Sequence, residues 1–489
     1  MGTVGIQNGA RDELNQRIRS AYTWGTAGTA IKQLLGFGIS IALARLLQPS
    51  DYGLVGMVLV FIGLLSTVQE LGFGQAVVHF DEGSLNLATL FGATIVIGGL
   101  STILLFALSP LISSFYHESR LTPVLHVLSL TLLLTGIQSV PNSLLAKTFR
   151  FKALAIRDSL PTFAAAGIAL VMAYKGFGVW SLVTNMVLSA GLQTVLAIWM
   201  VPIKLSVRVD RKALKRALDY GLPLMSAILI QQICDNADYL VVGKMMGATA
   251  LGYYALAFRL ATLAHEKIGV IVNRIAFPSF AAMQGDHISV VEHWLSVSRA
   301  ISFLNFPLLS FLFLNARDLI LLLFGEKWMP VISPLRYLCV VGILRGLLTV
   351  TLHLLNALGH TKATLLLSAA GLVLLPGSFI VGCALGGITG VGIAWCVAYP
   401  ILLVIVLLKV KTLIDFSLLD YITNLRQPGF IAAGILIVTG PLGWLSFTPL
   451  WRLCLRGIVS AVICLVWAST YPAVRRRFSV LRPARLLRV

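Results

Sequence analysis

Basic residues stand inside long apolar stretches of this sequence, where a cation has little water to solvate it. A charge near the centre of a membrane helix costs about 2.5–3.5 kcal/mol, so such residues are functional candidates. Guanidinium and ammonium groups match the oxygens of phosphates, and several around one cavity suit a multiply anionic ligand. We therefore predict a cationic substrate-binding cavity formed by Lys32, Arg259, Arg345, Lys267 and Arg274.

A structural role is the alternative for a cation in such a stretch. Long basic side chains reach the headgroups from helix ends, or pair with nearby carboxylates. Position favours this role for Lys267, Arg274 and Arg336, which lie near the ends of their predicted helices. Lys32 and Arg345, like Arg259, lie deeper and favour ligand binding.

Uncharged and acidic polar side chains cluster on a predicted helix at 217–243. With a helical period they form a polar face about 160° wide, and such a face lines water or substrate. The face consists of Gln231, Gln232, Asp235, Asn236 and Asp238. Two of its acids, together with Glu70, could bind a coupling proton or sodium ion, or could instead neutralise a neighbouring arginine.

Motifs for catalysis are missing from the sequence. It has no GxxxxGK[ST] phosphate loop, no GxSxG nucleophile elbow and no zinc-ligand spacing. All six cysteines lie in apolar runs without CxxC spacing, as buried small hydrophobic residues do. We expect no resident cofactor or metal, and no catalysis on a soluble substrate.

The elements that position these residues must be membrane helices. Of the 489 residues, 57% are hydrophobic and only 12% are charged, against about 25% charged residues in a soluble domain. Crossing the hydrocarbon takes about 20 apolar residues, and windows of that length predict about fourteen spans. The spans are 22–46, 51–79, 85–108, 121–146, 154–174, 177–201, 217–243, 250–278, 294–316, 331–358, 363–384, 387–408, 429–447 and 452–472.

The net charge of +19 is explained by this topology. Most basic residues outside the spans fall on one side, and the positive-inside rule makes that side cytoplasmic. Both termini are then cytoplasmic, and the charge does not indicate a nucleic-acid partner.

An internal repeat divides the predicted helices. ARLLQPSDYGLVGMVL after the first span aligns with GKMMGATALGYYALAF after the seventh, which pairs Arg45 with Lys244 and Gly53 with Gly252. Halves with an even number of helices enter the membrane from the same side, so the repeat is parallel. The fold class predicted is all-α, with two parallel six-helix repeats and two further C-terminal helices.

The repeat sets the expected organisation of the chain. It comprises a cytoplasmic segment at 1–20, an N-lobe at 21–202, a basic cytoplasmic linker at 203–218, a C-lobe at 219–409, a cytoplasmic loop at 410–428, two helices at 429–472 and an Arg-rich cytoplasmic tail at 473–489.

Several segments of these helices together resemble the polysaccharide transporter (Wzx-type flippase) family of the MATE-like multidrug/oligosaccharidyl-lipid/polysaccharide flippase superfamily. They include LARLLQPSDYGLVGM (43–57), ELGFGQAVV (70–78), VPNSLLAKTFRFKALA (140–155), NADYLVVGKMMGATALGYYALAFRL (236–260) and LLFGEKWMPVISPLRYL (322–338). The resemblance implies a V-shaped transporter of two lobes around a cationic cavity, working by alternating access.

The resemblance further implies a flippase that moves polyprenyl-diphosphate-linked oligosaccharide from the inner to the outer leaflet of a bacterial inner membrane. Membrane lipids and the polysaccharide polymerase and export machinery would be its partners. A cation-coupled multidrug exporter of the same fold is one alternative, although Lys32 stands in the first helix, where such exporters commonly have a carboxylate. A membrane polymerase or ligase of lipid-linked sugars is another.

Overall fold

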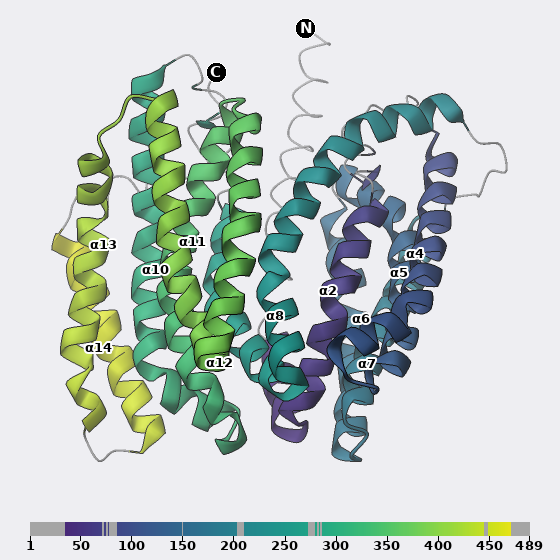
Figure 1. The fold of residues 1–489 in the computed structure, drawn as a ribbon, viewed down its shortest axis with the longest axis horizontal. Coiled ribbons are helices and arrows are strands. Elements are labelled where there is room, and N and C mark those ends of the chain that lie inside the picture. The colour runs from purple at the N-terminus through teal and green to yellow at the C-terminus, as the bar shows by residue number, and fades with distance from the viewer. Residues whose placement is uncertain are drawn as a thin grey trace, which may run out of the picture. The chain divides into compact units, whose positions relative to one another are not determined.

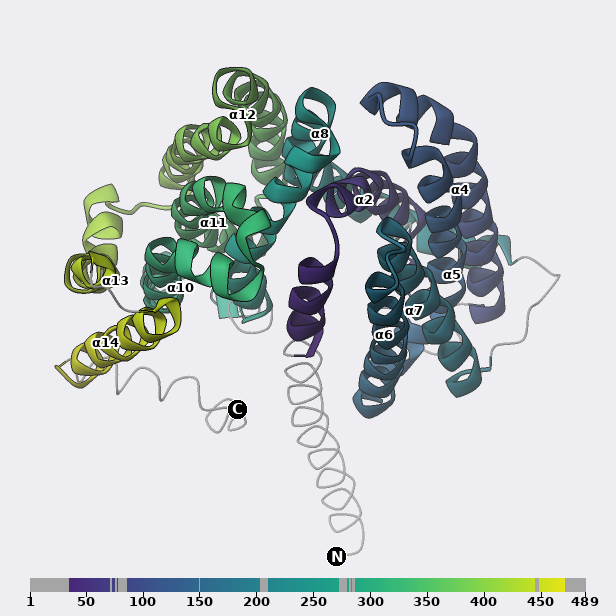
Figure 2. The same cartoon turned by 90° about the horizontal axis from the view of Figure 1, so that it is seen from below.

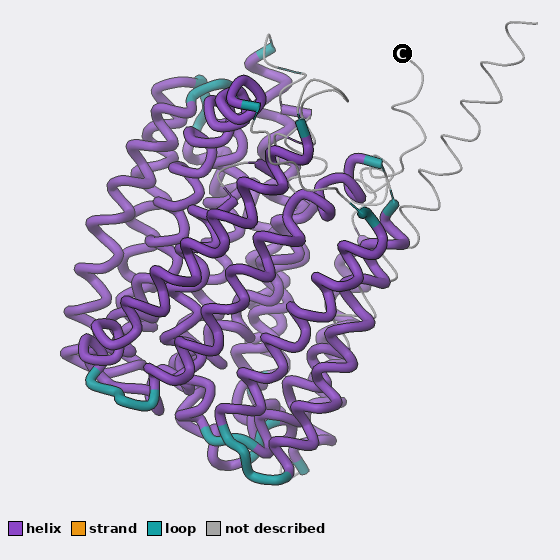
Figure 3. The backbone as a smooth tube through the Cα atoms, turned by 90° about the vertical axis from the view of Figure 1, so that its right-hand side faces the viewer, coloured by secondary structure: helices purple, strands orange, loops and turns teal. Residues whose placement is uncertain are grey.

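The described part of this computed structural model consists of helices joined by short connections and contains no strand (Figure 3). The structure describes residues 35–70, 73, 74, 77, 86–148, 150–202, 210–271, 279, 280, 283, 286–444 and 448–470. Two compact units divide the chain, an N-terminal unit of Met1–Gly252 and a C-terminal unit of Tyr253–Val489. The all-helical membrane fold predicted from the sequence is confirmed in this part of the chain.

The N-terminal unit is built on α5, which packs against four neighbouring helices. Two clusters of buried apolar residues hold these helices together, one centred on Phe73 and Leu90 and the other on Leu43 and Ala169. Figure 1 labels the elements of this unit. They are α2 (Pro49–Glu70), α4 (Leu87–Tyr116), α5 (Leu121–Lys147), α6 (Phe151–Tyr174), α7 (Val179–Met200) and the larger part of α8 (Arg211–Ile271).

The C-terminal unit is arranged around α10, which packs against α11, α13 and α14 (Figure 2). Its longest helix, α12, packs on α11. Beyond the end of α8, its elements are α10 (His287–Leu323), the short η2 (Glu326–Val331), α11 (Ile332–Ala357), α12 (Thr361–Leu413), α13 (Leu418–Thr439), η3 (Pro441–Trp444) and α14 (Pro449–Thr470).

Eleven described helices are long and apolar enough to cross a membrane. Two of them are interrupted by residues with non-helical backbone angles, Gly247 in α8 and Gly386–Gly387 in α12. Gly247 and Gly387 have φ of 79° and 58°, a region that glycine enters without steric cost. Both breaks fall where the sequence predicts one span to end and the next to begin. The count of fourteen spans stays a prediction, because the first span lies largely outside the described residues.

The two glycines that the repeat aligns touch each other's helix. A Cβ built on Gly53 would lie 1.6 Å from the carbonyl oxygen of Ala248, and one built on Gly252 would lie 1.8 Å from that of Pro49. Pro49 is the first residue of α2, and Ala248 is the first helical residue after the break at Gly247. Gly53 is four residues after Pro49, and Gly252 is four residues after Ala248. Only glycine allows these two backbones to approach so closely. The contact is reciprocal.

The same contact explains where the compact units divide. The repeat separates an N-lobe and a C-lobe at the linker 203–218, whereas the units divide after Gly252. The chain up to Gly252 stays with the first unit because it packs backbone to backbone against α2.

The predicted loop at 410–428 is wrong over most of its length. α12 continues to Leu413, and α13 begins at Leu418 after a cap in which the Ser417 hydroxyl accepts the backbone N–H of Asp420. Asn424 of α13 is buried, accepts a hydrogen bond from the Arg299 guanidinium at 2.6 Å and donates one to the Leu295 carbonyl at 2.7 Å. The buried Asn424 looked like a loop residue in the sequence because its partners lie on α10.

Candidate functional site

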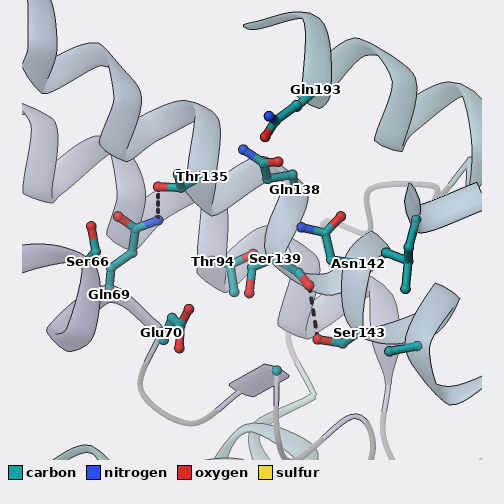
Figure 4. A pocket seen from close by; sticks show the side chains of 13 residues that line it. Ser66, Gln69, Glu70, Thr94, Thr135, Gln138, Ser139, Asn142, Ser143 and Gln193 are labelled. Carbon is teal, nitrogen blue, oxygen red and sulfur yellow. Dashed lines mark hydrogen bonds between the residues drawn. The ribbon is translucent and has the colours of Figure 1, made fainter. Parts of the chain in front are cut away.

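A polar pocket lies among the apolar helices of the N-terminal unit. Its volume is about 850 Å³, within the roughly 300–1,000 Å³ of small-molecule sites. Figure 4 shows Gln69 and Glu70 on one side of it and Gln138 and Asn142 on the other. The described residues that line this amide–hydroxyl pocket are Ser66, Gln69, Glu70, Gly74, Thr94, Thr135, Gln138, Ser139, Asn142, Ser143, Ala146, Leu154 and Gln193.

Helical spacing on α5 forms one wall of the pocket. Gln138, Ser139, Asn142 and Ser143 stand at i, i+1, i+4 and i+5, so their side chains share one face of the helix. The wall opposite comes from the last turn of α2, which contributes Ser66, Gln69 and Glu70. The remaining polar groups of the described lining come from α4, from α7 and from Thr135 on α5.

Close packing of α4 on α5 holds Gln69 in place. Gly98 and Gly136 face each other, and a Cβ on Gly136 would lie 2.6 Å from the Thr94 carbonyl oxygen and 2.8 Å from Nε2 of Gln69. The space that two missing side chains leave is filled by the Gln69 amide, which is buried and donates to the Thr135 hydroxyl at 3.4 Å.

Buried acceptors are left over in this pocket. Oε1 of Gln69 and Oδ1 of Asn142 are buried and find no hydrogen-bond partner among the described residues. Leaving a buried polar group unpaired costs about 1–3 kcal/mol, so these atoms favour a donor from water or a ligand. Glu70 is the one ionisable residue among the described lining residues, and it is an acid. The pocket can therefore accept hydrogen bonds from a neutral ligand.

A basic residue predicted to bind substrate lies in an aromatic cluster of the C-terminal unit. The Arg345 guanidinium of α11 stands 5.4 Å from the ring centre of Phe258 and 5.6 Å from that of Trp395. Trp395 is fixed by its indole N–H, which donates to the hydroxyl of buried Tyr254 at 2.9 Å. Cation–π contacts of this kind orient a guanidinium.

Only some of the other predicted cations lie in the part of the chain that the structure describes. Arg259 is exposed on α8, directly after Phe258. Lys267 lies in α8, but its side chain is outside the described part, and Lys32 and Arg274 lie outside the described residues altogether. The cationic cavity as a whole thus stays a prediction, with Arg345 as its best-defined member.

The polar stripe of α8 is divided between exposed and buried residues. Gln231 is exposed and donates to the Asp235 carboxylate at 3.0 Å, whereas Asp238 is fully buried and accepts the backbone N–H of Tyr239 at 2.8 Å. Gln232 reaches α2, with Nε2 at 2.7 Å from the Cβ position of Gly63, and its carbonyl accepts from the Asn236 amide. A role of this stripe in lining a cavity stays a prediction.

Glu70, predicted from the sequence as a possible ion-coupling residue, lies at this pocket. The neutral residues that line the pocket were not among the predicted site residues, since the predicted polar face lies on α8. The run QSVPNS (138–143) carried the signal, since it sets four polar groups on one face of a helix that is otherwise apolar.

Comparison with known families decides the class of this chain. Residues 42–333, more than half of the sequence, match the model of the family described as "Polysaccharide biosynthesis protein". The chain belongs to the polysaccharide biosynthesis protein family.

Relatives of this family match over most of their length. The teichuronic acid biosynthesis protein TuaB of Bacillus subtilis (strain 168) is 26% identical over 87% of this chain and 89% of its own. The lipopolysaccharide biosynthesis protein WzxC of Escherichia coli (strain K12) is 24% identical over 88% of each chain. The family resemblance predicted from the sequence segments is confirmed.

Solved structures share the fold. The lipid II flippase MurJ in an inward closed conformation has a TM-score of 0.73 and 15% identity, covering 91% of this chain and 98% of its own. An inward-facing multidrug resistance MATE family transporter of the MOP superfamily has a TM-score of 0.63 and 17% identity, covering 78% and 95%. The polysaccharide biosynthesis protein therefore has the MATE-like transporter fold expected from its sequence.

Proposed function

We propose that this protein is a flippase for lipid-linked oligosaccharide in the synthesis of a surface polysaccharide. It is a transporter and not an enzyme. The observation that carries the proposal is the amide–hydroxyl pocket within a bundle of apolar membrane helices. A polar head group in hydrocarbon loses several kcal/mol for each unsatisfied group, and hydrogen-bonding walls offset that loss. The names of TuaB, WzxC and the succinoglycan biosynthesis transport protein ExoT support the same function.

The substrate that fits best carries a polyprenyl diphosphate. Its sugars need hydrogen-bonding groups, its lipid can remain in the bilayer, and its phosphates need cations such as Arg345. Arg259, Lys32, Lys267 and Arg274 are further candidates for that role.

Movement runs from the cytoplasmic to the outer leaflet of a bacterial inner membrane, with both chain termini cytoplasmic. An inside-negative potential favours outward transfer of an anion by about 2.3 kcal/mol per charge for each 100 mV. Coupling to a proton or sodium ion through Glu70, Asp235 or Asp238 would add to this drive. The polymerase and export machinery act on the product at the outer leaflet.

Sidedness of the lipid-linked oligosaccharide in cells lacking this gene tests the proposal. An impermeant sugar-oxidising reagent is applied to intact spheroplasts and to lysed ones, and the modified fraction is compared with that in cells carrying the gene. We expect the intermediate to accumulate where only lysis exposes it, and the gene in trans to restore its exposure.

Two results would overturn the proposal in favour of a named rival. Single lipid-linked units accumulating on the outer leaflet would indicate a polymerase or ligase. Normal sidedness, together with loss of drug resistance in the deletion strain, would indicate a multidrug exporter.

Ion coupling is tested separately with Glu70→Gln, which removes the ionisable carboxylate that lines the pocket. If Glu70 carries the coupling ion, transport into proteoliposomes should lose its response to an imposed pH or sodium gradient and keep its response to membrane potential. Asp219→Asn, an exposed acid of α8 outside the pocket, is the control. An unchanged gradient response in Glu70→Gln would exclude this carboxylate as the coupling site.

A further inference from the structure

We propose that the amide–hydroxyl pocket is a recognition site for uncharged sugar units, and that it selects them because its walls present hydrogen-bond acceptors. The inference rests on the proposed function and deepens it, since it separates binding of the sugars from binding of the diphosphate. The pocket belongs to the N-terminal unit alone, in helices α2, α4, α5, α6 and α7.

Four of the five hydroxyl groups that line the pocket donate their protons within their own helices. Each donates to a carbonyl three or four residues earlier in its own helix, at 2.7–3.1 Å. What these side chains offer to a ligand is therefore the lone pairs of their oxygens. The hydroxyls concerned are those of Ser66, Thr94, Thr135 and Ser143.

The amide side chains add acceptor oxygens, while Gln138 and Asn142 also bring N–H donors to the pocket. Nε2 of Gln193 donates to the hydroxyls of Ser189 and Thr162, at 3.1 and 3.3 Å. Nε2 of Gln69 donates to the Thr135 hydroxyl, and Oε1 of Gln69 is one of the two buried acceptors of the pocket without a partner among the described residues. Asn142 contributes the other through Oδ1.

The charge of the described lining residues disfavours the diphosphate of the expected substrate in this pocket. A diphosphate brings only acceptor oxygens and negative charge, and no cation is among the described lining residues to receive it. Glu70, the one ionisable residue among them, is an acid. The nearest basic residue along α5, Lys147, directs its Nζ to the backbone carbonyl of Val77 at 2.9 Å. A phosphate here would meet acceptors and a carboxylate, and both disfavour it.

A sugar has the complementary character. Every hydroxyl is a donor that an unpartnered acceptor can receive, and an N-acetyl group adds one N–H. Buried acceptors built to receive such donors discriminate strongly, because a ligand without them leaves the acceptors unpaired. Gln69 is the more rigid of the two acceptors, since Gly98 and Gly136 leave room for its amide and for little else.

Binding of the two halves of the head group tests the inference. The purified protein in nanodiscs is titrated with octyl glycosides of glucose, galactose and N-acetylglucosamine, and in parallel with farnesyl diphosphate. We expect the wild type to bind at least one glycoside. Asn142→Leu and Gln69→Leu should each bind it about tenfold more weakly, with farnesyl diphosphate binding unchanged.

Two further variants control for folding and for the chemistry. Asn185→Leu removes an equally buried, unpartnered amide oxygen of the same unit that does not line the pocket, and should bind the glycoside as the wild type does. Asn142→Asp keeps acceptor oxygens at the same place and should retain glycoside binding. If Asn142 had only a structural role, Asn142→Leu would bind the glycoside at least as well as Asn142→Asp.

The inference is overturned if no glycoside binds the wild type, if Asn142→Leu binds it normally, or if the same variants lose farnesyl diphosphate. Failure of the proposed function looks different. Glycosides would then bind through the pocket while deletion of the gene left lipid-linked sugars on the outer leaflet.

Discussion

Replacing Gly53 with alanine should be among the most destabilising single changes in this protein. The new Cβ would lie 1.6 Å from the carbonyl oxygen of Ala248, a backbone atom that cannot turn aside. Raising that distance to 3.0 Å means moving the two backbones apart by about 1.4 Å along this line. Overpacking that side chains can absorb costs about 1–3 kcal/mol, and a clash between two backbones should reach or exceed the upper end of that range.

Thermal unfolding of the purified protein in nanodiscs measures the effect. Gly53→Ala and Gly252→Ala should each lose at least about 3 kcal/mol of unfolding free energy. The double variant should lose much less than the sum, because separating Gly53 from Ala248 also moves Gly252, one helical turn further on, away from Pro49.

Gly99→Ala is the matched control. Gly99 lies in α4 with no atom near its Cβ position, so alanine there should change stability by no more than about 1 kcal/mol, through helix propensity. Wild-type stability of Gly53→Ala, or strict additivity with Gly252→Ala, would refute the reciprocal close contact.

The remaining predictions concern charges. Asp318→Ala removes a buried carboxylate that Arg452 contacts at 3.0 Å and should cost about 3–5 kcal/mol in thermal unfolding; full stability would show that the other hydrogen bonds of α14 suffice. Arg345→Gln should weaken farnesyl diphosphate binding and leave octyl glycoside binding unchanged, and the opposite pattern would remove Arg345 from the phosphate site. The hydrogen bond from Arg120 lowers the pKa of Glu118. The pair therefore stabilises the fold at pH values above the usual pKa of a glutamate, and this contribution is lost as the pH falls through the lowered pKa. Arg120→Gln should therefore be slightly less stable than wild type at pH 7 and equally stable below pH ~3, when both are compared by thermal unfolding.

Prediction from sequence succeeded where a residue's own type carries the information. Apolar runs of membrane length specify α5, α6, α7 and α11 to within a few residues, because burying hydrocarbon in lipid depends on composition and length alone. It failed at 418–428, where Asn424 of α13 is paired with Arg299 of α10, because periodicity cannot reveal a partner 125 residues away.

The neutral polar residues of the pocket show more clearly what the sequence cannot predict. The helical period alone places Gln138 and Asn142 on one face of α5, but it does not say whether that face meets lipid, protein or a pocket. The answer came from the packing of α4 on α5 at Gly98 and Gly136, which brings Gln69 to the same space.

The sequence by itself therefore determined the membrane fold and the position of most described helices, since these follow from hydrophobic length. Only the tertiary structure decided which uncharged side chains meet. Hydrogen-bond partners are chosen by geometry between helices, and an acceptor-lined pocket exists only once those helices have packed.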